Sequence, residues 1–336
     1  MKARALYFVR PREVEIRGEP LRPCRSREVL VSSELSAISA GTELLFYRGE
    51  LEEGVAVDIS LPLLAEPLRY PLRYGYCSVG TVVDTGPDVP AELRGRRCFA
   101  FHPHQDRFIE SVERLLPVPE GTSAEEACFL AHLETAVSLV MDGAPVLGES
   151  VAVVGQGVVG LLVAALLSRM GVLQLTVVDP VALRLECAQR MCPGVRRATS
   201  ASEGLAQGPF DLVFELSGRL SGLQAALSLL RFEGRLVVGS WYGDRASAIA
   251  LGTSVHRNRN TVLFSQVSRI DSRHAARFDR ARRLGVALEW LARVPVETLV
   301  THRIPFEEAP AAFRLLDERP DACLQVLLTH PRGGRG

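Results

Sequence analysis

The strongest indication of the fold lies in residues 151–179, VAVVGQGVVGLLVAALLSRMGVLQLTVVD. The apolar run VAVV leads directly into a GxGxxG pattern formed by Gly155, Gly157 and Gly160, and an apolar run of helical length follows it. A second apolar run, LTVV, ends at Asp179. A strand, a glycine turn, a helix, a second strand and an acidic residue in this order are typical of a dinucleotide-binding βαβ unit.

Each position of this fingerprint predicts a physical role in cofactor binding. Gly155 permits a tight turn, Gly157 lets the backbone approach a pyrophosphate, and Gly160 lets the helix pack closely on the strand. The pyrophosphate is expected at the helix N-terminus, where free amides and the helix dipole favour negative charge. Asp179 can accept hydrogen bonds from the adenosine ribose and repels a 2′-phosphate, so the sequence favours NAD(H). Arg184 is the one residue that argues for NADP(H).

Later loops of the same region are expected to complete the cofactor site. The strand GRLVV is followed by Gly239, Ser240 and Trp241, and Ser217 follows the strand DLVFE in the same way. Since open α/β sheets bind ligands at the carboxyl ends of their strands, we expect these loops to border the nicotinamide. The predicted cofactor-binding residues are therefore Gly155, Gln156, Gly157, Val158, Val159, Gly160, Asp179, Ser217, Gly239, Ser240 and Trp241.

The texture of the rest of the chain predicts two domains. Residues 1–122 alternate apolar and polar residues in short runs broken by glycine and proline, which is typical of a β-rich domain. Residues 123–269 alternate continuous apolar strands with amphipathic helices. That alternation indicates an α/β domain with a doubly wound parallel sheet covered on both faces. The last segment, residues 270–336, is expected to return to the first domain.

Composition excludes several classes of protein. The 336 residues are 47% hydrophobic, and Lys+Arg and Asp+Glu both number 39, so no excess positive charge is present to hold a nucleic acid. No run reaches the roughly 18 apolar residues that span a bilayer, and the start becomes charged before a signal-peptide core develops. We therefore expect a cytoplasmic protein with no membrane or nucleic-acid partner. The seven cysteines lie far apart without a CxxC spacing, which predicts reduced thiols.

A β-rich N-terminal part, a dinucleotide domain and a short C-terminal return together resemble the medium-chain dehydrogenase/reductase superfamily over nearly the whole chain. Residues 40–43, Ala-Gly-Thr-Glu, lie where zinc-dependent members have Cys-x-Thr/Ser-Asp. Residues 75–80, GYCSVG, lie where those members have Gly-His-Glu-x-x-Gly. The resemblance implies a GroES-like catalytic domain at residues 1–122 and 270–336, and a Rossmann NAD-binding domain at residues 123–269.

The same resemblance implies that no catalytic zinc is bound. Ala40 and Tyr76 stand at two of the three ligand positions, and the third falls at or next to Ala131. A catalytic zinc needs three protein ligands, so we expect no metal, although His132 could still coordinate something. The chain is thus similar to the zinc-free branch, which includes quinone and enoyl-thioester reductases. Its SAGTE stretch, residues 39–43, also resembles the bacteriochlorophyllide dehydrogenase group.

A site without zinc must handle the charge on a substrate oxygen with side chains. Reduction of a C=C bond conjugated to a carbonyl passes charge to an enolate, which hydrogen-bond donors stabilise. We therefore predict a zinc-independent, NADH-dependent reductase of an activated C=C bond, in an enone or in an α,β-unsaturated thioester such as an enoyl-CoA. Two alternatives remain open: a zinc-free NAD-dependent dehydrogenase of a conjugated secondary alcohol, and a non-catalytic NAD-binding regulatory protein.

Four side chains are candidates for catalysis. By the resemblance, Thr42 matches a proton-relay hydroxyl and Tyr76 places a phenol at a former ligand position, and either could donate to an enolate oxygen. His102 and His104 lie in the polar stretch HPHQDR and could bind a carboxylate or a substrate oxygen. The competing interpretations are a packed aromatic for Tyr76 and an exposed loop edge for the histidines. Glu43 is expected to hold an arginine or a backbone amide.

The strand TVLFSQV, residues 261–267, is expected at the edge of the dinucleotide sheet. An exposed apolar edge invites pairing with another chain. In the superfamily that this chain resembles, the equivalent strand pairs with its twin, which predicts a homodimer. The other expected partner is a small-molecule substrate such as a CoA thioester.

Overall fold

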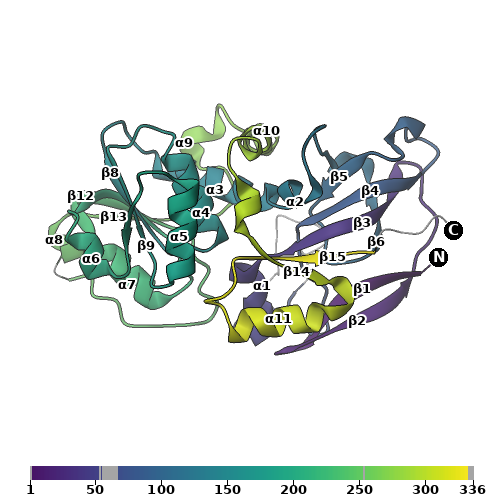
Figure 1. The fold of residues 1–336 in the computed structure, drawn as a ribbon, viewed down its shortest axis with the longest axis horizontal. Coiled ribbons are helices and arrows are strands. Elements are labelled where there is room, and N and C mark those ends of the chain that lie inside the picture. The colour runs from purple at the N-terminus through teal and green to yellow at the C-terminus, as the bar shows by residue number, and fades with distance from the viewer. Residues whose placement is uncertain (1, 53, 55–66, 253, 332–336) are drawn as a thin grey trace. The chain divides into compact units, whose positions relative to one another are not determined.

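The computed structural model of the chain describes residues 2–52, 54, 67–252 and 254–331. The chain divides into two compact units (Figure 1). We call them unit 1, which comprises Met1–Ala131 and Val300–Gly336, and unit 2, which is His132–Leu299. Within the described ranges, no helix is both long enough and apolar enough to cross a membrane.

The units divide at later positions than the sequence analysis expects. The expected divisions follow residues 122 and 269, whereas the structure divides the chain after residues 131 and 299. The second difference has a physical cause in helix α10 (Arg280–Leu291), whose Arg283 is buried. Its guanidinium Nη2 lies 2.8 Å from Oε1 of Glu134 on helix α3 (Leu130–Gly143). This ion pair attaches α10 to unit 2.

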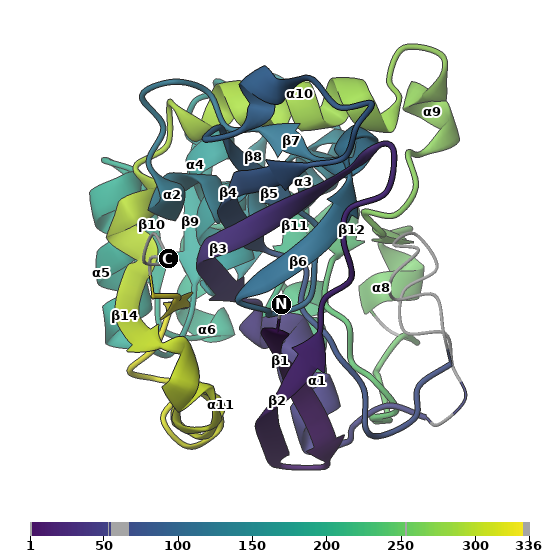
Figure 2. The same ribbon diagram turned by 90° about the vertical axis from the view of Figure 1, so that its right-hand side faces the viewer.

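Unit 1 has the β-rich architecture that the sequence predicts. A seven-stranded sheet runs in the order β14 (Val300–Pro305), β15 (Gln325–Thr329), β3 (Glu28–Ile38), β4 (Ser78–Thr85), β5 (Arg97–Ala100) and β7 (Leu116–Pro117), with β6 (Arg107–Ser111) paired to β3. Figure 2 shows β3 between β4 and β6. The unit also contains the hairpin β1 (Lys2–Arg10) and β2 (Glu13–Pro20), and helices α1 (Ala40–Arg48), α2 (Ala124–Ala127) and α11 (Ala309–Glu318).

A hydrophobic core of unit 1 forms where helix α11 packs against the β1–β2 hairpin. In α11 the buried residues Ala309, Ala312, Phe313 and Leu316 recur at helical spacing, so one apolar stripe faces inward. The ring of Phe313 meets that of Phe8 from β1 edge-on, with centroids 5.2 Å apart. This cluster also buries Phe46 of α1, so it holds that helix against the hairpin of β1 and β2.

Unit 2 is a six-stranded parallel sheet with the strand order β10, β9, β8, β11, β12, β13. Its strands are β8 (Ser150–Val154), β9 (Gln174–Val178), β10 (Arg196–Ala198), β11 (Phe210–Glu215), β12 (Leu230–Val238) and β13 (Thr261–Phe264). This is the doubly wound order, in which the strands after β8 are added on one side of it as far as β10 and on its other side from β11 onward. A switch point of this kind opens a crevice at the carboxyl ends of the two strands, which are Val154 and Glu215.

Helices cover both faces of this sheet, as the continuous apolar strands predict. In Figure 1, α4 and α5 lie on one side of the sheet and α6 and α7 lie on the other. The helices of unit 2 besides α3 and α10 are α4 (Val158–Leu167), α5 (Ala182–Met191), α6 (Ala201–Leu205), α7 (Leu220–Ser228), α8 (Ser254–Arg257) and α9 (Ser272–Ala275). α4 is buried from Gly160 to Leu167, because nearly all its residues are apolar.

Candidate functional site

The glycine turn of unit 2 has three different packing environments. Gly155 has φ +91°, and a Cβ there would lie 2.5 Å from the backbone nitrogen of Ser217, so only glycine fits. At Gly160 a Cβ would lie 1.9 Å from the carbonyl oxygen of Gly155, which brings α4 tightly onto the turn. At Gly157 a Cβ would meet no heavy atom within 4 Å. The free approach to the backbone is therefore at Gly157, the residue that caps α4.

Asp179 ties the end of β9 to this turn. Its Oδ2 accepts a hydrogen bond from the backbone N–H of Gln156 at 2.7 Å, and its Oδ1 accepts one from Val181 at 2.9 Å. The Nη1 atom of Arg184 lies 3.5 Å from the same Oδ2. The carboxylate is only 2% exposed. Asp179 thus holds the glycine turn in place. Arg184, which favours NADP(H), lies beside Asp179, which favours NAD(H).

A buried carboxylate that sequence reasoning missed joins the loops after β11 and β12. Oε1 of Glu215, which has no exposed surface, accepts hydrogen bonds from the backbone N–H and the hydroxyl of Ser217. Oε2 accepts from the phenol of Tyr242, and burial raises the pKa of that phenol. The hydroxyl of Ser240 accepts from the backbone N–H of Gly218 at 2.8 Å. The signal in the sequence is an acidic residue that closes the apolar strand DLVFE.

The other predicted cofactor residues lie along the same edge of the sheet. Gln156 is fully buried, and its side-chain Nε2 donates to the carbonyl of Val153 at 3.0 Å. Val158 and Val159 open α4 and are half-buried. Trp241 is exposed.

These residues fit a dinucleotide. The N-cap of α4 has no side-chain hydrogen bond, so no side chain of the cap covers the first amides of a ten-residue helix. The backbone at Gly157 is open on the same end. Uncrowded backbone amides at the positive end of a helix dipole are the chemistry that a pyrophosphate requires.

In unit 1, three hydroxyl groups meet at the start of α1. We call Ser39, Thr42 and Tyr76 the hydroxyl cluster. The phenol of Tyr76, which precedes β4, donates to the hydroxyl of Ser39 and lies 3.5 Å from Oγ1 of Thr42. Burial raises the pKa of Tyr76, so the phenol is protonated at neutral pH and acts as a donor. The structure therefore brings the predicted Thr42 and Tyr76 together.

Behind this cluster lies a fully buried pair, Glu43 and His104. Oε1 of Glu43 accepts from the backbone N–H of Ser39 at 2.7 Å, as expected of a residue that holds a backbone amide. Oε2 of Glu43 lies 2.9 Å from Nε2 of His104, and Nδ1 of His104 lies 2.8 Å from the hydroxyl of Ser36. Both ring nitrogens of His104 are thus engaged inside the protein. His104 therefore lies in the interior, although the sequence suggests that it contacts the substrate.

His102 also differs from its expected role. Its ring is buried and stacks on that of Phe108, with centroids 3.9 Å apart. Its Nδ1 lies 2.9 Å from the carbonyl oxygen of Pro103. Burial lowers the pKa of His102 to about 4, because the interior disfavours the charged imidazolium. Although the motif HPHQDR is polar, these contacts turn both imidazoles inward, so neither histidine lies at an exposed loop edge.

The side chains at the three expected ligand positions lack the donor atoms that bind a catalytic zinc. Ala40 of α1 and Ala131 of α3 carry only methyl groups, and Tyr76 carries a protonated phenol. Zinc in such sites is bound by thiolates, imidazoles and carboxylates. Among the residues that the structure describes, no three histidine, cysteine or acidic side chains form a group that could hold a metal ion.

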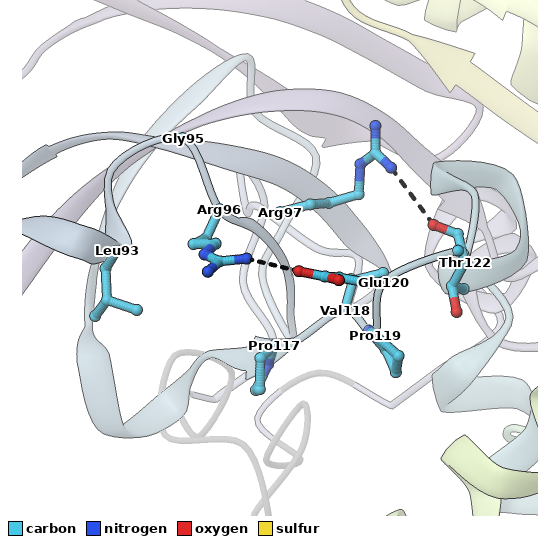
Figure 3. A pocket seen from close by; sticks show the side chains of 10 residues that line it. Leu93, Gly95, Arg96, Arg97, Pro117, Val118, Pro119, Glu120 and Thr122 are labelled. Carbon is cyan, nitrogen blue, oxygen red and sulfur yellow. Dashed lines mark hydrogen bonds and ion pairs between the residues drawn. The ribbon is translucent and has the colours of Figure 1, made fainter.

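Unit 1 also has a pocket that contains none of the predicted site residues. It is lined by Leu93, Gly95, Arg96, Arg97 and residues 117–122 (Figure 3). Its two guanidinium groups already have partners, since Arg96 pairs with Glu120 at 3.1 Å and Arg97 donates to the carbonyl of Thr122 at 3.4 Å. The pocket therefore offers no obvious charge for a ligand.

Comparison with known proteins identifies similar dehydrogenases. A family model described as zinc-binding dehydrogenase matches residues 194–322. D-guloside 3-dehydrogenase of Escherichia coli K12 is 26% identical over 330 residues, which cover 90% of this chain and 93% of the relative. The 2-desacetyl-2-hydroxyethyl bacteriochlorophyllide A dehydrogenase of Cereibacter sphaeroides is 24% identical over 357 residues, which cover 98% of each.

A solved structure has the same fold as this chain. The alcohol dehydrogenase rspB from E. coli CFT073, complexed with NADH, has a TM-score of 0.77 and 19% sequence identity. The match covers 98% of this chain and 99% of that one.

The predicted reduction of an activated C=C bond is wrong. Both full-length relatives are named as dehydrogenases, one of a guloside and one of a hydroxyethyl compound. The error has a physical reason: the loss of metal ligands limits how the charge on an oxygen is stabilised, but it does not decide which bond exchanges the hydride. The expectation of a CoA thioester rested on the same argument and is withdrawn.

Proposed function

The chain belongs to the medium-chain dehydrogenase/reductase superfamily, and on that basis we propose that it is an NAD(H)-dependent dehydrogenase of a secondary alcohol on a sugar or polyol. The observation that carries the proposal is the hydroxyl cluster, in which the phenol of Tyr76, at the position of one lost zinc ligand, meets the aliphatic hydroxyls of Ser39 and Thr42. The full-length relatives act, by their names, on position 3 of a guloside and on a hydroxyethyl group. Both names support an alcohol substrate.

Unit 2 would hold the cofactor through its backbone. When bound, NAD⁺ supplies the hydride acceptor for alcohol oxidation, and NADH supplies the donor for the reverse reaction. The amides at Gly157 and the first turn of α4 would bind the pyrophosphate, and Asp179 would accept from the ribose. The bonds from Ser217 and Tyr242 to Glu215 keep the two neighbouring loops in one conformation. We expect NADH to bind more tightly than NADPH, because the carboxylate of Asp179, which two backbone amides hold in place, repels a 2′-phosphate.

Tyr76 would handle the proton at the substrate oxygen. In ketone reduction, the phenol donates its proton to the carbonyl oxygen as negative charge develops there, and it takes up the proton of the Ser39 hydroxyl, which solvent water replaces. In alcohol oxidation, the phenol oxygen accepts the hydroxyl proton and its own proton passes along the hydrogen bond to the Ser39 hydroxyl, which releases its proton to solvent water. The hydroxyl cluster therefore stabilises the charge on the substrate oxygen and transfers its proton, which a metal ion does in the zinc enzymes. We propose that the reaction is zinc-independent.

The test is alcohol oxidation by chelator-treated protein. We would incubate it with NAD⁺ and gulosides, polyols or hydroxyethyl-substituted rings, and follow NADH absorbance. Tyr76→Phe is expected to lower kcat by roughly 10²- to 10³-fold, the usual cost of losing one donor to a developing oxyanion. Tyr70→Phe is the matched control, since Tyr70 is a tyrosine of the same unit that lies outside the hydroxyl cluster and whose phenol donates to the backbone carbonyl of Phe46. Dependence on added zinc, or full activity of Tyr76→Phe, would refute the proposal.

We further propose that β13 pairs with its twin in a homodimer. It is the edge strand of the sheet in unit 2, and Phe264 is 66% exposed there. An apolar edge with unpaired backbone groups favours association with another strand. Light scattering should report a dimer for the wild-type chain and a monomer for Phe264→Arg. A monomeric wild type at micromolar concentration would contradict this proposal.

A further inference from the structure

We propose that His104 is a positioning residue that sets the direction of the Tyr76 phenol, acting through Glu43 on one side and Gly75 on the other. The inference rests on the proposed function, because it assigns the phenol its role. His104 itself has no exposed surface and cannot touch a substrate.

The first contact reaches the acceptor of the phenol. Nε2 of His104 lies 2.9 Å from Oε2 of Glu43, and Oε1 of Glu43 accepts from the backbone N–H of Ser39. The hydroxyl of Ser39 accepts the hydrogen bond from Tyr76. Glu43 therefore joins the imidazole to the residue that receives the phenol proton.

The second contact reaches the backbone that carries the phenol. Gly75 directly precedes Tyr76 and has φ +120°, a conformation that favours glycine. A Cβ at Gly75 would lie 2.8 Å from Cδ2 and 2.9 Å from Nε2 of His104. The ring of His104 therefore packs directly against the residue before Tyr76. Both ends of the hydrogen bond from Tyr76 to Ser39 are thus located by one imidazole.

The orientation of that ring is itself fixed by buried partners. The Ser36 hydroxyl lies 2.8 Å from Nδ1 of His104 and 3.2 Å from Nε2 of His330. Glu43 has no exposed surface, so it cannot exchange His104 for water as a partner. If the imidazole is removed, the carboxylate must turn or become protonated, and the amide of Ser39 loses a fixed acceptor.

Two substitutions separate the contacts of the two ring nitrogens. The side-chain nitrogen of His104→Asn corresponds to Nδ1 and keeps the contact with Ser36, whereas that of His104→Gln corresponds to Nε2 and keeps the contact with Glu43. We expect His104→Asn to lower kcat by about 100-fold with little change in KM, since a shift of about 1 Å in a catalytic group has this cost. His104→Gln should recover most of that loss.

A second readout does not depend on turnover. With the six tyrosines labelled as 3-fluorotyrosine, the ¹⁹F resonance of Tyr76 is assigned by its absence in Tyr76→Phe. It should shift in His104→Asn and keep its wild-type position in His104→Gln. If the wild type oxidises no alcohol, the proposed function fails, while this resonance still tests the positioning. If His104→Asn does not fold, Glu43→Asp shortens the reach of the carboxylate and should produce the same shift.

Glu134→Gln is the control for a purely structural loss. Glu134 is a buried carboxylate of unit 2 that pairs with Arg283, so its substitution should lower stability without changing kcat or the Tyr76 resonance. Positioning by His104 is overturned if His104→Asn leaves kcat and the resonance unchanged. It is equally overturned if His104→Gln loses as much turnover as His104→Asn.

Discussion

Gly157→Ala should separate cofactor binding from folding in unit 2. Gly157 has φ −69° and ψ −176°, an extended conformation that alanine adopts without strain. A Cβ there meets no heavy atom within 4 Å, so the folded protein accommodates the methyl group. Alanine is a poorer N-cap than glycine, and we expect the free energy of unfolding to fall by less than about 1 kcal/mol.

The same methyl group should obstruct the pyrophosphate. It would stand where the phosphate oxygens must approach the amides at the start of α4. Loss of one hydrogen bond to a charged group costs about 1.5–3 kcal/mol. Since about 1.4 kcal/mol corresponds to a factor of ten, NADH should bind roughly 10- to 150-fold more weakly.

The assay combines NADH fluorescence titration with urea unfolding of the cofactor-free protein. Gly160→Ala is the comparison, because its Cβ would lie 1.9 Å from the carbonyl oxygen of Gly155 and must force α4 away from the turn. We expect that variant to lose about 1–3 kcal/mol of unfolding free energy or more. Wild-type NADH affinity in Gly157→Ala would show that the pyrophosphate does not bind at Gly157.

Two further predictions concern buried charge. His102 has a pKa of about 4 in the folded protein. As the pH falls below about 6.5, its imidazole is protonated in the unfolded chain but stays neutral in the folded protein. The free energy of unfolding therefore decreases until the pH reaches about 4. This loss amounts to about 3 kcal/mol. His102→Gln should flatten the difference between urea unfolding at pH 7 and pH 4, and an unchanged difference would contradict it. Arg283→Met leaves Glu134 buried without this guanidinium and should cost about 3–5 kcal/mol in urea unfolding, whereas adding Glu134→Leu should restore much of the loss.

The sequence alone determined the cofactor domain, because its signals are local. Gly155, Gly157, Gly160 and Asp179 lie within residues 151–179, and their roles follow from backbone conformation and from the order of strand, turn and helix. The apolar strands likewise predicted the parallel sheet, since each strand must be covered on both faces. Neighbouring residues carry this information, and no distant partner is needed to interpret it.

The contacts of the polar residues outside that stretch depend on the tertiary structure. Glu43 and His104 are 61 residues apart, and Tyr76 and Ser39 are 37 apart, so no spacing in the sequence announces either contact. The polar stretch HPHQDR predicted either a substrate contact or an exposed loop edge for its two histidines, yet both are buried. A buried polar side chain is stable only with a partner, and which partner it meets depends on how distant segments of the chain cross.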